Sequence, residues 1–483
     1  MLFSSWIFWV FLPVVLAGYF LLRHAKQNAL LLVASLVFYG WWDWRFVGLL
    51  AFTATLDFCV ALGLDRRAQG TDDHLLPRSR RKALLLASVV ANLGVLAFFK
   101  YFHFFEDSLV DLMSSVAGHR VEPTGLDIIL PAGISFYTFQ SMSYTIDVYR
   151  GELRATRSLV DFGAFVTFFP HLVAGPIVRA SLLLPQVAKP RHHDSARFNE
   201  GGYLILWGMF KKVVVADNVS PLVGAIFAAN PASLSGGTVL LASYAFALQI
   251  YCDFSGYTDI ARGCAKLMGF EIPLNFNLPY AARSPSDFWQ RWHISLSSWL
   301  RDYLYIPLGG NRARSARVYF NLMVTMLLGG LWHGARWTFV AWGAYQGLLL
   351  VIWRAAAPRL ASVPILADAA RTRAVHFLQW LVFFHLVCLG WLIFRAQSFT
   401  QLRDMIAALL RGVELAGSGE LAWQLMLFGA PVVLMQVAQY FRGRLNVVLD
   451  LPAPVRGALY ASWLVGIALL GQFKGNEFIY FQF

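Results

Sequence analysis

Histidine is the clearest candidate for acid–base chemistry among the residue types of this sequence. Of its 11 histidines, His333 lies deep in an apolar run, residues 327–335 (LLGGLWHGA), whose glycines permit close helix approach. An ionisable side chain inside a membrane segment is a candidate functional residue by default. Burial there disfavours the charged imidazolium, so we expect a neutral ring that can accept a proton, as a general base must.

His293 is the second candidate, in residues 288–297 (FWQRWHISLS). On one continuous helix, Trp289, His293 and Leu296 would share a face at i, i+4 and i+7. The surrounding segment, residues 283–317, mixes aromatic residues with many charges, which cannot face lipid because a charge at mid-bilayer costs about 2.5–3.5 kcal/mol. We expect this segment to line a protein interior, a wet cavity or the membrane interface.

His171, in residues 168–176 (FFPHLVAGP), is a third candidate for substrate contact. The remaining histidines have ordinary explanations, as solvated loop residues or as interfacial residues: His24, His74, His103, His119, His192, His193, His376 and His385.

Several other kinds of site are excluded or disfavoured. No GxSxG, Walker, GxGxxG or HExxH motif is present. The 4 cysteines form no CxxC pair, so neither a disulfide framework nor a metal site is expected. The net charge of +13 comes from basic residues in short loops between apolar stretches, which indicates membrane topology and no nucleic-acid partner.

Composition sets the fold class. The chain has 483 residues, of which 58% are hydrophobic and 14% charged. Apolar stretches recur along it at about the 20 residues that a bilayer requires, so we expect an all-α polytopic membrane protein with roughly ten to twelve transmembrane helices. Residues 5–22 are interpreted as the first membrane helix rather than a signal peptide. Without repeats or linkers, residues 1–483 are expected to form a single membrane domain.

The loops predict the topology. Residues 65–82 are strongly basic and therefore cytoplasmic, which places the N-terminus outside and the acidic loop 106–127 outside as well. Residues 129–148 are expected to return the chain to the cytoplasm. Residues 159–178 have basic flanks on both sides, which favours a re-entrant or interfacial element, with a kinked span as the alternative.

Six stretches closely resemble the membrane-bound O-acyltransferase family, within it the alginate O-acetyltransferase branch. The likeness extends over about residues 2–395, has its core motifs within 129–353 and leaves 395–483 weakly informative. These stretches are residues 134–139 (ISFYTF), 251–259 (YCDFSGYTD), 275–280 (NFNLPY), 288–306, 309–312 (GGNR) and 330–334 (GLWHG). The resemblance implies re-entrant and transmembrane helices around a central funnel, His333 as the catalytic histidine, His293 as the second position, and acetyl-CoA or another acyl thioester as donor.

Acyl transfer needs a deprotonated hydroxyl, donors for the developing oxyanion and exclusion of water. We expect His333 to take the proton while donors near Trp292, His293 and Trp332 hold the oxyanion, with Trp289 also lining the cavity. Arg312 and Arg314 could attract the donor's phosphates or simply be topology charges, and Asp302 is expected to pair with Arg301. Direct transfer and a short-lived acyl-histidine both remain open.

The predicted function is transfer of acetyl groups from a cytoplasmic donor across the inner membrane for O-acetylation of an extracytoplasmic polysaccharide such as alginate. Separate periplasmic proteins are expected to complete the transfer. The alternatives are the same chemistry on peptidoglycan, cellulose or another glycan, D-alanylation of teichoic acid, and a polysaccharide or lipid-linked transporter. Against the transporter, no pair of matching interrupted helices occurs in two halves.

Overall fold

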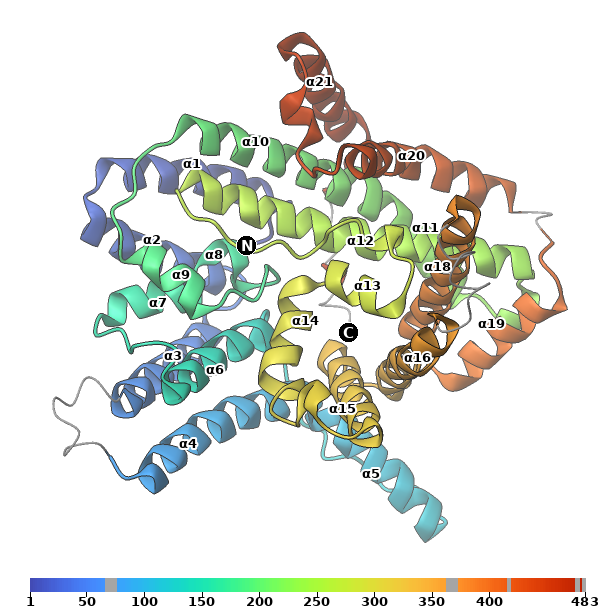
Figure 1. The fold of residues 1–483 in the computed structure, drawn as a ribbon, viewed down its shortest axis with the longest axis horizontal. Helices are drawn as coiled ribbons and strands as arrows, with labels where there is room; N and C mark the ends of the chain where they lie inside the picture. The colour runs from blue at the N-terminus through green and yellow to red at the C-terminus, as the bar shows by residue number, and fades with distance from the viewer. Residues whose placement is uncertain (66–75, 362–371, 415–417, 474–477, 480–483) are drawn as a thin grey trace. The chain divides into compact units, whose positions relative to one another are not determined.

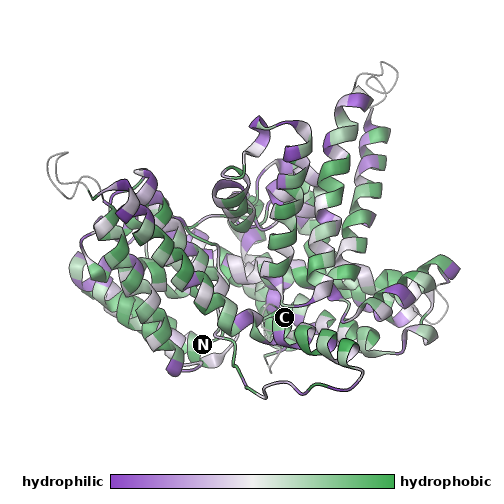
Figure 2. Ribbon diagram, turned by 90° about the horizontal axis from the view of Figure 1, so that it is seen from below, coloured by the Kyte–Doolittle hydropathy of each residue, from purple (hydrophilic) through white to green (hydrophobic). Residues whose placement is uncertain are grey.

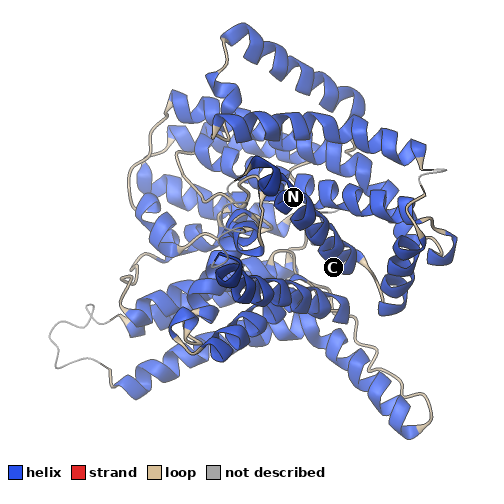
Figure 3. Ribbon diagram, turned by 45° about the vertical axis from the view of Figure 1, so that its right-hand side comes forward, coloured by secondary structure: helices blue, strands red, loops and turns tan. Residues whose placement is uncertain are grey.

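The structure is a computed structural model, and it describes residues 1–65, 76–361, 372–414, 418–473 and 478–479. Within these ranges the chain forms helices and no strands (Figures 1 and 3). Its contacts divide into two compact units, which are described in turn. Residues 66–75 of the predicted cytoplasmic loop lie outside the described residues.

The first unit comprises Met1–Gly202 and Ala261–Pro273. Two of its helices, α10 and α12, continue into the second unit, and a π-helical turn, Ala97–Tyr101, joins α4 to α5. Its helices are α1 (Trp6–Leu21), α2 (His24–Gly40), α3 (Arg45–Leu64), α4 (Arg78–Leu96), α5 (Phe102–Ala117), α6 (Ile134–Arg150), α7 (Leu159–Thr167), α8 (Phe169–Leu172), α9 (Ala180–Val187) and α10 (Ser195–Met209).

A buried carboxylate ties three helices of the first unit together. Asp57 on α3 accepts hydrogen bonds from Ser88 at 2.6 Å and from Asn92 at 2.9 Å, both on α4, and from Ser141 on α6. A buried charge must be hydrogen-bonded or paired, since its desolvation otherwise costs several kcal/mol. The polar residues of these helices therefore meet in the unit's interior instead of facing lipid.

The second unit comprises Tyr203–Ile260 and Leu274–Phe483. Short 3-10 turns connect some of its helices, and π-helical turns occur at Phe210–Ala216 and Arg301–Tyr305. Its helices are α11 (Asp217–Ala228), α12 (Gly236–Leu267), α13 (Pro285–Arg291), α14 (Ile294–Leu300), α15 (Ser315–His333), α16 (Trp337–Ala361), α18 (Arg373–Arg395), α19 (Phe399–Arg411), α20 (Gly419–Arg442) and α21 (Ala453–Leu470).

Seven helical segments of the described chain are long and apolar enough to cross a membrane, and hydrophobic residues predominate along them (Figure 2). Together with the shorter apolar helix α1 they make this a multi-pass membrane protein. The seven segments are Arg45–Leu64, Arg78–Ala117, Gly236–Leu267, Trp337–Arg359, Arg373–Arg395, Gly419–Arg442 and Ala453–Leu470. The sequence-based number, ten to twelve, also counted apolar stretches that form shorter or more polar helices.

Three predicted segments differ from the structure in detail. The expected span at 129–148 is α6, whose many buried polar residues keep it below the hydropathy of a membrane span. The expected outer loop at 106–127 is helical as far as Ala117. Residues 159–178 contain two short helices, α7 and α8, separated at Phe168, and whether they form a re-entrant element or a kinked span stays a prediction.

Candidate active site

The second unit brings its two candidate histidines together. The ring centroids of His293 and His333 lie 6.2 Å apart, and the two residues are 0% and 2% exposed. The indole of Trp332 lies beside both rings, at 5.7 Å from His293 and 5.1 Å from His333. His293 and His333 are thus far apart in the sequence and adjacent in one buried cluster. We call these two residues the histidine pair.

The continuous helix expected through Trp289, His293 and Leu296 is wrong. Helix α13 ends at Arg291 and α14 begins at Ile294, and between them His293 adopts a left-handed backbone with φ of 44°. Such a conformation is uncommon for a residue other than glycine and marks a constrained position. Because of this break, the orientation of the His293 side chain is not set by the faces of α13 or α14.

Asn275 holds this break in place. Its backbone carbonyl accepts a hydrogen bond from the Ile294 N–H at 3.0 Å, and its side-chain oxygen accepts from the Ser295 hydroxyl at 2.6 Å. Its amide nitrogen donates to Thr258 on α12 at 3.3 Å. Asn275 is fully buried, so these bonds satisfy polar groups that water cannot reach. It therefore fixes the residues immediately after His293 against α12.

Aromatic side chains surround the histidine pair. His333 contacts Trp342 at 5.1 Å and Phe394 at 5.5 Å between ring centroids, and His293 contacts Phe254 at 4.6 Å. This apolar enclosure excludes water from both rings. Burial lowers the pKa of His293 to about 3, so its imidazole is neutral at physiological pH.

Close packing of α15 on α16 positions His333. A Cβ atom added at Gly330 would lie 2.3 Å from the carbonyl oxygen of Phe339, and one added at Gly343 would lie 2.4 Å from that of Met326. The two helices can approach this closely because both residues lack a side chain. Gly330 precedes His333 by one helical turn, so the spacing of α15 and α16 sets the position of the imidazole.

Trp342, which contacts His333, and Trp289, which contacts Trp342, carry buried indole N–H donors. The indole nitrogens of Trp289 and Trp342 make no hydrogen bond with any described residue. Their rings lie 5.9 Å apart, and Trp342 is in direct contact with His333. An indole N–H can only donate a hydrogen bond, so these two groups are free to donate to a polar group held beside them.

The predicted tryptophans thus divide into two groups. Trp332 lies beside both histidines, whereas Trp289 contacts Trp342, which in turn contacts His333. The ring contacts of Trp292 are instead with Phe276 at 4.9 Å and Trp391 at 4.7 Å. Trp342 took no part in the sequence-based site, because nothing in its local sequence separates it from the other tryptophans of an apolar helix.

Buried ion pairs hold α12, the helix whose Phe254 contacts His293. The Lys212 ammonium lies 2.7 Å from Asp253 on α12 and 2.8 Å from Asp217, while Lys211 lies 2.7 Å from Asp259. These pairs compensate charges that would otherwise be costly within an apolar protein. Both lysines lie on the π-helical turn Phe210–Ala216, and such turns occur often at functional sites.

The C-terminal segment also reaches α12. The Ile479 N–H donates to Asp253 at 2.8 Å, and the Phe478 ring lies 5.7 Å from that of Phe254, the residue that contacts His293. This contact could not be predicted from the sequence, since two apolar residues after the last helix carry no periodicity. The C-terminus therefore contributes to the wall of the site.

Of the charged residues predicted for the site, Arg301 and Asp302 pair with each other, and the other two are exposed. Arg301 donates to Asp302 at 2.7 Å, which confirms the predicted pair. Arg312 and Arg314 are exposed at the turn before α15, and their predicted contact with the donor's phosphates stays a prediction. Within the described ranges no cluster of three or more histidine, cysteine or acidic residues could hold a metal ion.

His171 belongs to the first unit, on α8, so its predicted contact with substrate stays a prediction. It is 1% exposed, and neither ring nitrogen forms a hydrogen bond with a described residue. Burial lowers its pKa to about 3.

Comparison with known proteins identifies the family. The profile of the membrane-bound O-acyltransferase family (MBOAT) matches residues 148–393, which include both histidines. The chain is 45% identical to the probable alginate O-acetylase of Azotobacter vinelandii over 85% of its own length and 78% of that protein. It is 46% identical to the probable alginate O-acetylase of Pseudomonas aeruginosa over 82% and 72% of the two chains.

A third relative acts on a different polymer. The chain is 35% identical to the peptidoglycan O-acetyltransferase of Helicobacter pylori, over 86% of this chain and 81% of that protein. The relatives thus share acyl transfer to a polysaccharide and differ in the acceptor that their names state. The chain belongs to the membrane-bound O-acyltransferase family and is an O-acyltransferase.

Proposed function

We propose that this enzyme takes acetyl groups from acetyl-CoA on the cytoplasmic side of the inner membrane and passes them outward for O-acetylation of a secreted polysaccharide such as alginate. The observation that carries the proposal is the buried pair of His293 and His333, enclosed by aromatic residues with two unused indole donors beside it. A water-excluded site with a neutral base and fixed donors suits acyl transfer from a thioester.

His333 acts as the general base in the proposed reaction. It removes the proton from the acceptor hydroxyl as the hydroxyl oxygen attacks the thioester carbonyl carbon. The carbon–oxygen bond forms, and the carbonyl oxygen becomes an oxyanion. When the intermediate collapses the carbon–sulfur bond breaks, and the departing thiolate receives the proton from His333. His293, neutral and adjacent, orients the reacting groups.

The oxyanion is stabilised by indole N–H groups. Trp342 and Trp289 are the proposed donors, in addition to Trp332 beside both histidines. An indole N–H can donate a hydrogen bond and cannot accept one. It therefore stabilises an oxyanion, which accepts hydrogen bonds, and offers nothing to a group that needs an acceptor. Removing one such donor from an oxyanion site costs about 2.7–4 kcal/mol in other enzymes.

The donor is expected to enter from the cytoplasm, where Arg312 and Arg314 would attract its phosphates. The N-terminus is proposed to be extracytoplasmic on the basis of the positive-inside rule. A cysteine in place of Gly118, at the end of α5, should react with a membrane-impermeant thiol reagent added from outside. Protection of that cysteine in intact cells would reverse the topology.

The polymer that finally receives the acetyl group is proposed to be alginate, because the two relatives with about 45% identity are both named for alginate. Separate periplasmic proteins would complete the transfer onto the polymer. Peptidoglycan is the second candidate, favoured by the relative from Helicobacter pylori.

Deletion of the gene separates these acceptors. The O-acetyl content of the secreted polysaccharide and of the peptidoglycan would be measured separately, together with the polymer yield, before and after complementation with the wild-type chain. We expect acetyl groups to disappear from the secreted polysaccharide at unchanged yield. Loss of acetyl groups from peptidoglycan alone would assign that acceptor, and loss of the polymer itself would favour a transporter.

A further inference from the structure

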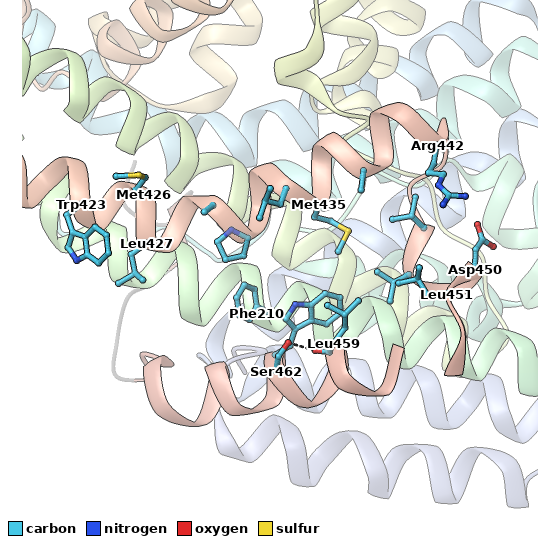
Figure 4. Close-up of a pocket in the computed structure, with 17 residues that line it drawn as sticks. Phe210, Trp423, Met426, Leu427, Met435, Arg442, Asp450, Leu451, Leu459 and Ser462 are labelled. Atoms are coloured by element: carbon cyan, nitrogen blue, oxygen red, sulfur yellow. Dashed lines mark hydrogen bonds between the residues drawn. The ribbon is translucent and has the colours of Figure 1, made fainter. Parts of the chain in front are cut away.

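An apolar groove lies on the second unit (Figure 4), and neither His293 nor His333 is among the residues that line it. It has a volume of about 830 Å³ and lies between α20 and α21. Phe210 and Trp463 line it, with ring centroids 6.3 Å apart. Apart from one serine, the polar lining residues are Arg442 and Asp450, which Figure 4 shows at the same end.

The dimensions of the groove match the membrane that surrounds it. Both α20 and α21 are candidate membrane spans, and little of either is buried within the protein. Trp423 and Arg442 lie near opposite ends of α20, about 28 Å apart for an α-helix. This length approximates the bilayer's apolar core of about 30 Å, with an aromatic and a basic residue placed where they are usual at the two interfaces. A groove along α20 is therefore long enough to accommodate acyl chains within the apolar core of a bilayer.

The charged end of the groove selects among lipids. Asp450 forms an ion pair with Arg444 at 3.1 Å, and Arg456 donates to the Leu449 carbonyl at 3.3 Å. Arg442 is exposed at the end of α20 and pairs with no described residue. The end thus has an excess of positive charge beside an apolar channel, which complements a phosphate group attached to acyl chains.

We propose that this groove binds an anionic phospholipid, with its acyl chains between α20 and α21 and its headgroup at Arg442. The bound lipid would also stabilise the π-helical turn Phe210–Ala216, and through it α12 at the active site. Phe210, which lines the groove, immediately precedes Lys211 and Lys212, whose ion pairs hold α12. This inference is independent of the proposed acetyl donor and acceptor.

The test measures retained lipid on the full chain. The protein would be reconstituted in nanodiscs of phosphatidylethanolamine with a minor fraction of phosphatidylglycerol, then extracted in mild detergent, and its phospholipids would be quantified by mass spectrometry. The variants are Arg442→Gln, which removes the free charge, and Ala438→Trp, which fills the groove. Arg411→Gln is the control, since Arg411 is also an exposed arginine at the end of a helix and does not line the groove.

We expect wild type and Arg411→Gln to retain phosphatidylglycerol in preference to phosphatidylethanolamine. Arg442→Gln should reduce that preference about five-fold, as one arginine near an anionic surface predicts, and Ala438→Trp should lose both lipids. Equal lipid composition in wild type and Arg442→Gln would overturn the proposal. It would also be overturned if Ala438→Trp kept its lipid but converted a dimer into a monomer, because the groove would then hold a second copy.

A measurement on the wild type alone guards against variants that fold poorly. The thermal midpoint of unfolding should rise as phosphatidylglycerol replaces phosphatidylethanolamine in the nanodisc, since a ligand that binds the folded state stabilises it. A midpoint that does not depend on phosphatidylglycerol would overturn the proposal without any substitution.

Discussion

Substitution of Gly330 by alanine tests whether the contact between α15 and α16 positions His333. The added methyl carbon would lie 2.3 Å from the Phe339 carbonyl oxygen, whereas a carbon–oxygen contact needs about 3.3 Å. The backbone carbonyl cannot rotate away, so α15 must shift by about 1 Å. Misplacement of a catalytic group by about 1 Å lowers the rate about 100-fold. Overpacking should also lower the free energy of unfolding by about 1–3 kcal/mol.

The neighbouring residue supplies the control. A methyl at Gly329 would lie 3.2 Å from a terminal methyl group of Leu300, which a small side-chain rotation relieves. O-acetyl content of the secreted polysaccharide would be measured at matched membrane levels of Gly330→Ala, Gly329→Ala and wild type. We expect a large loss for Gly330→Ala and little change for Gly329→Ala. Equal activity of the two variants would show that this contact does not set the position of His333.

Three further substitutions probe the surroundings of the histidine pair. Trp342→Phe removes the indole N–H and retains a ring, so kcat should fall about 100-fold or more with little change in KM, and a change confined to KM would contradict its role as oxyanion donor. Asn275→Ala removes the side-chain bonds that fix the residues after His293; acetyl transfer should be lost, and full activity would show that the break holds without them. Lys212→Met leaves the buried Asp253 without compensation, so the unfolding free energy should fall by about 3–5 kcal/mol, and an unchanged thermal midpoint would contradict that ion pair's importance.

The sequence pointed to His293 and His333 for different reasons, and the structure places their rings side by side. His333 is conspicuous because an ionisable residue in an apolar run requires an explanation. His293 was predicted within a helix, and the structure shows a break there. Local propensity could not reveal this break, since the hydrogen bonds that stabilise it come from Asn275, which is distant in sequence.

The rest of the site depends on tertiary contacts that no periodicity records. Trp342 is one tryptophan of an apolar helix until its ring is placed against His333. Phe478 lies beyond the last helix, and its burial beside α12 follows from packing alone. By contrast, the pairing of Arg301 with Asp302 was predictable because the two residues are adjacent and opposite in charge.

A substitution of His333 tests most directly its proposed role as the general base of acyl transfer. His385→Ala is a matched control, because His385 is a histidine on α18 whose ring bonds to Tyr244 and to the Leu381 carbonyl and has no ring contact with His333. In a deletion strain, His333→Ala should yield normal amounts of polysaccharide without O-acetyl groups at a normal level of membrane protein, while His385→Ala should restore acetylation. Normal acetylation by His333→Ala would show that His333 is not the general base.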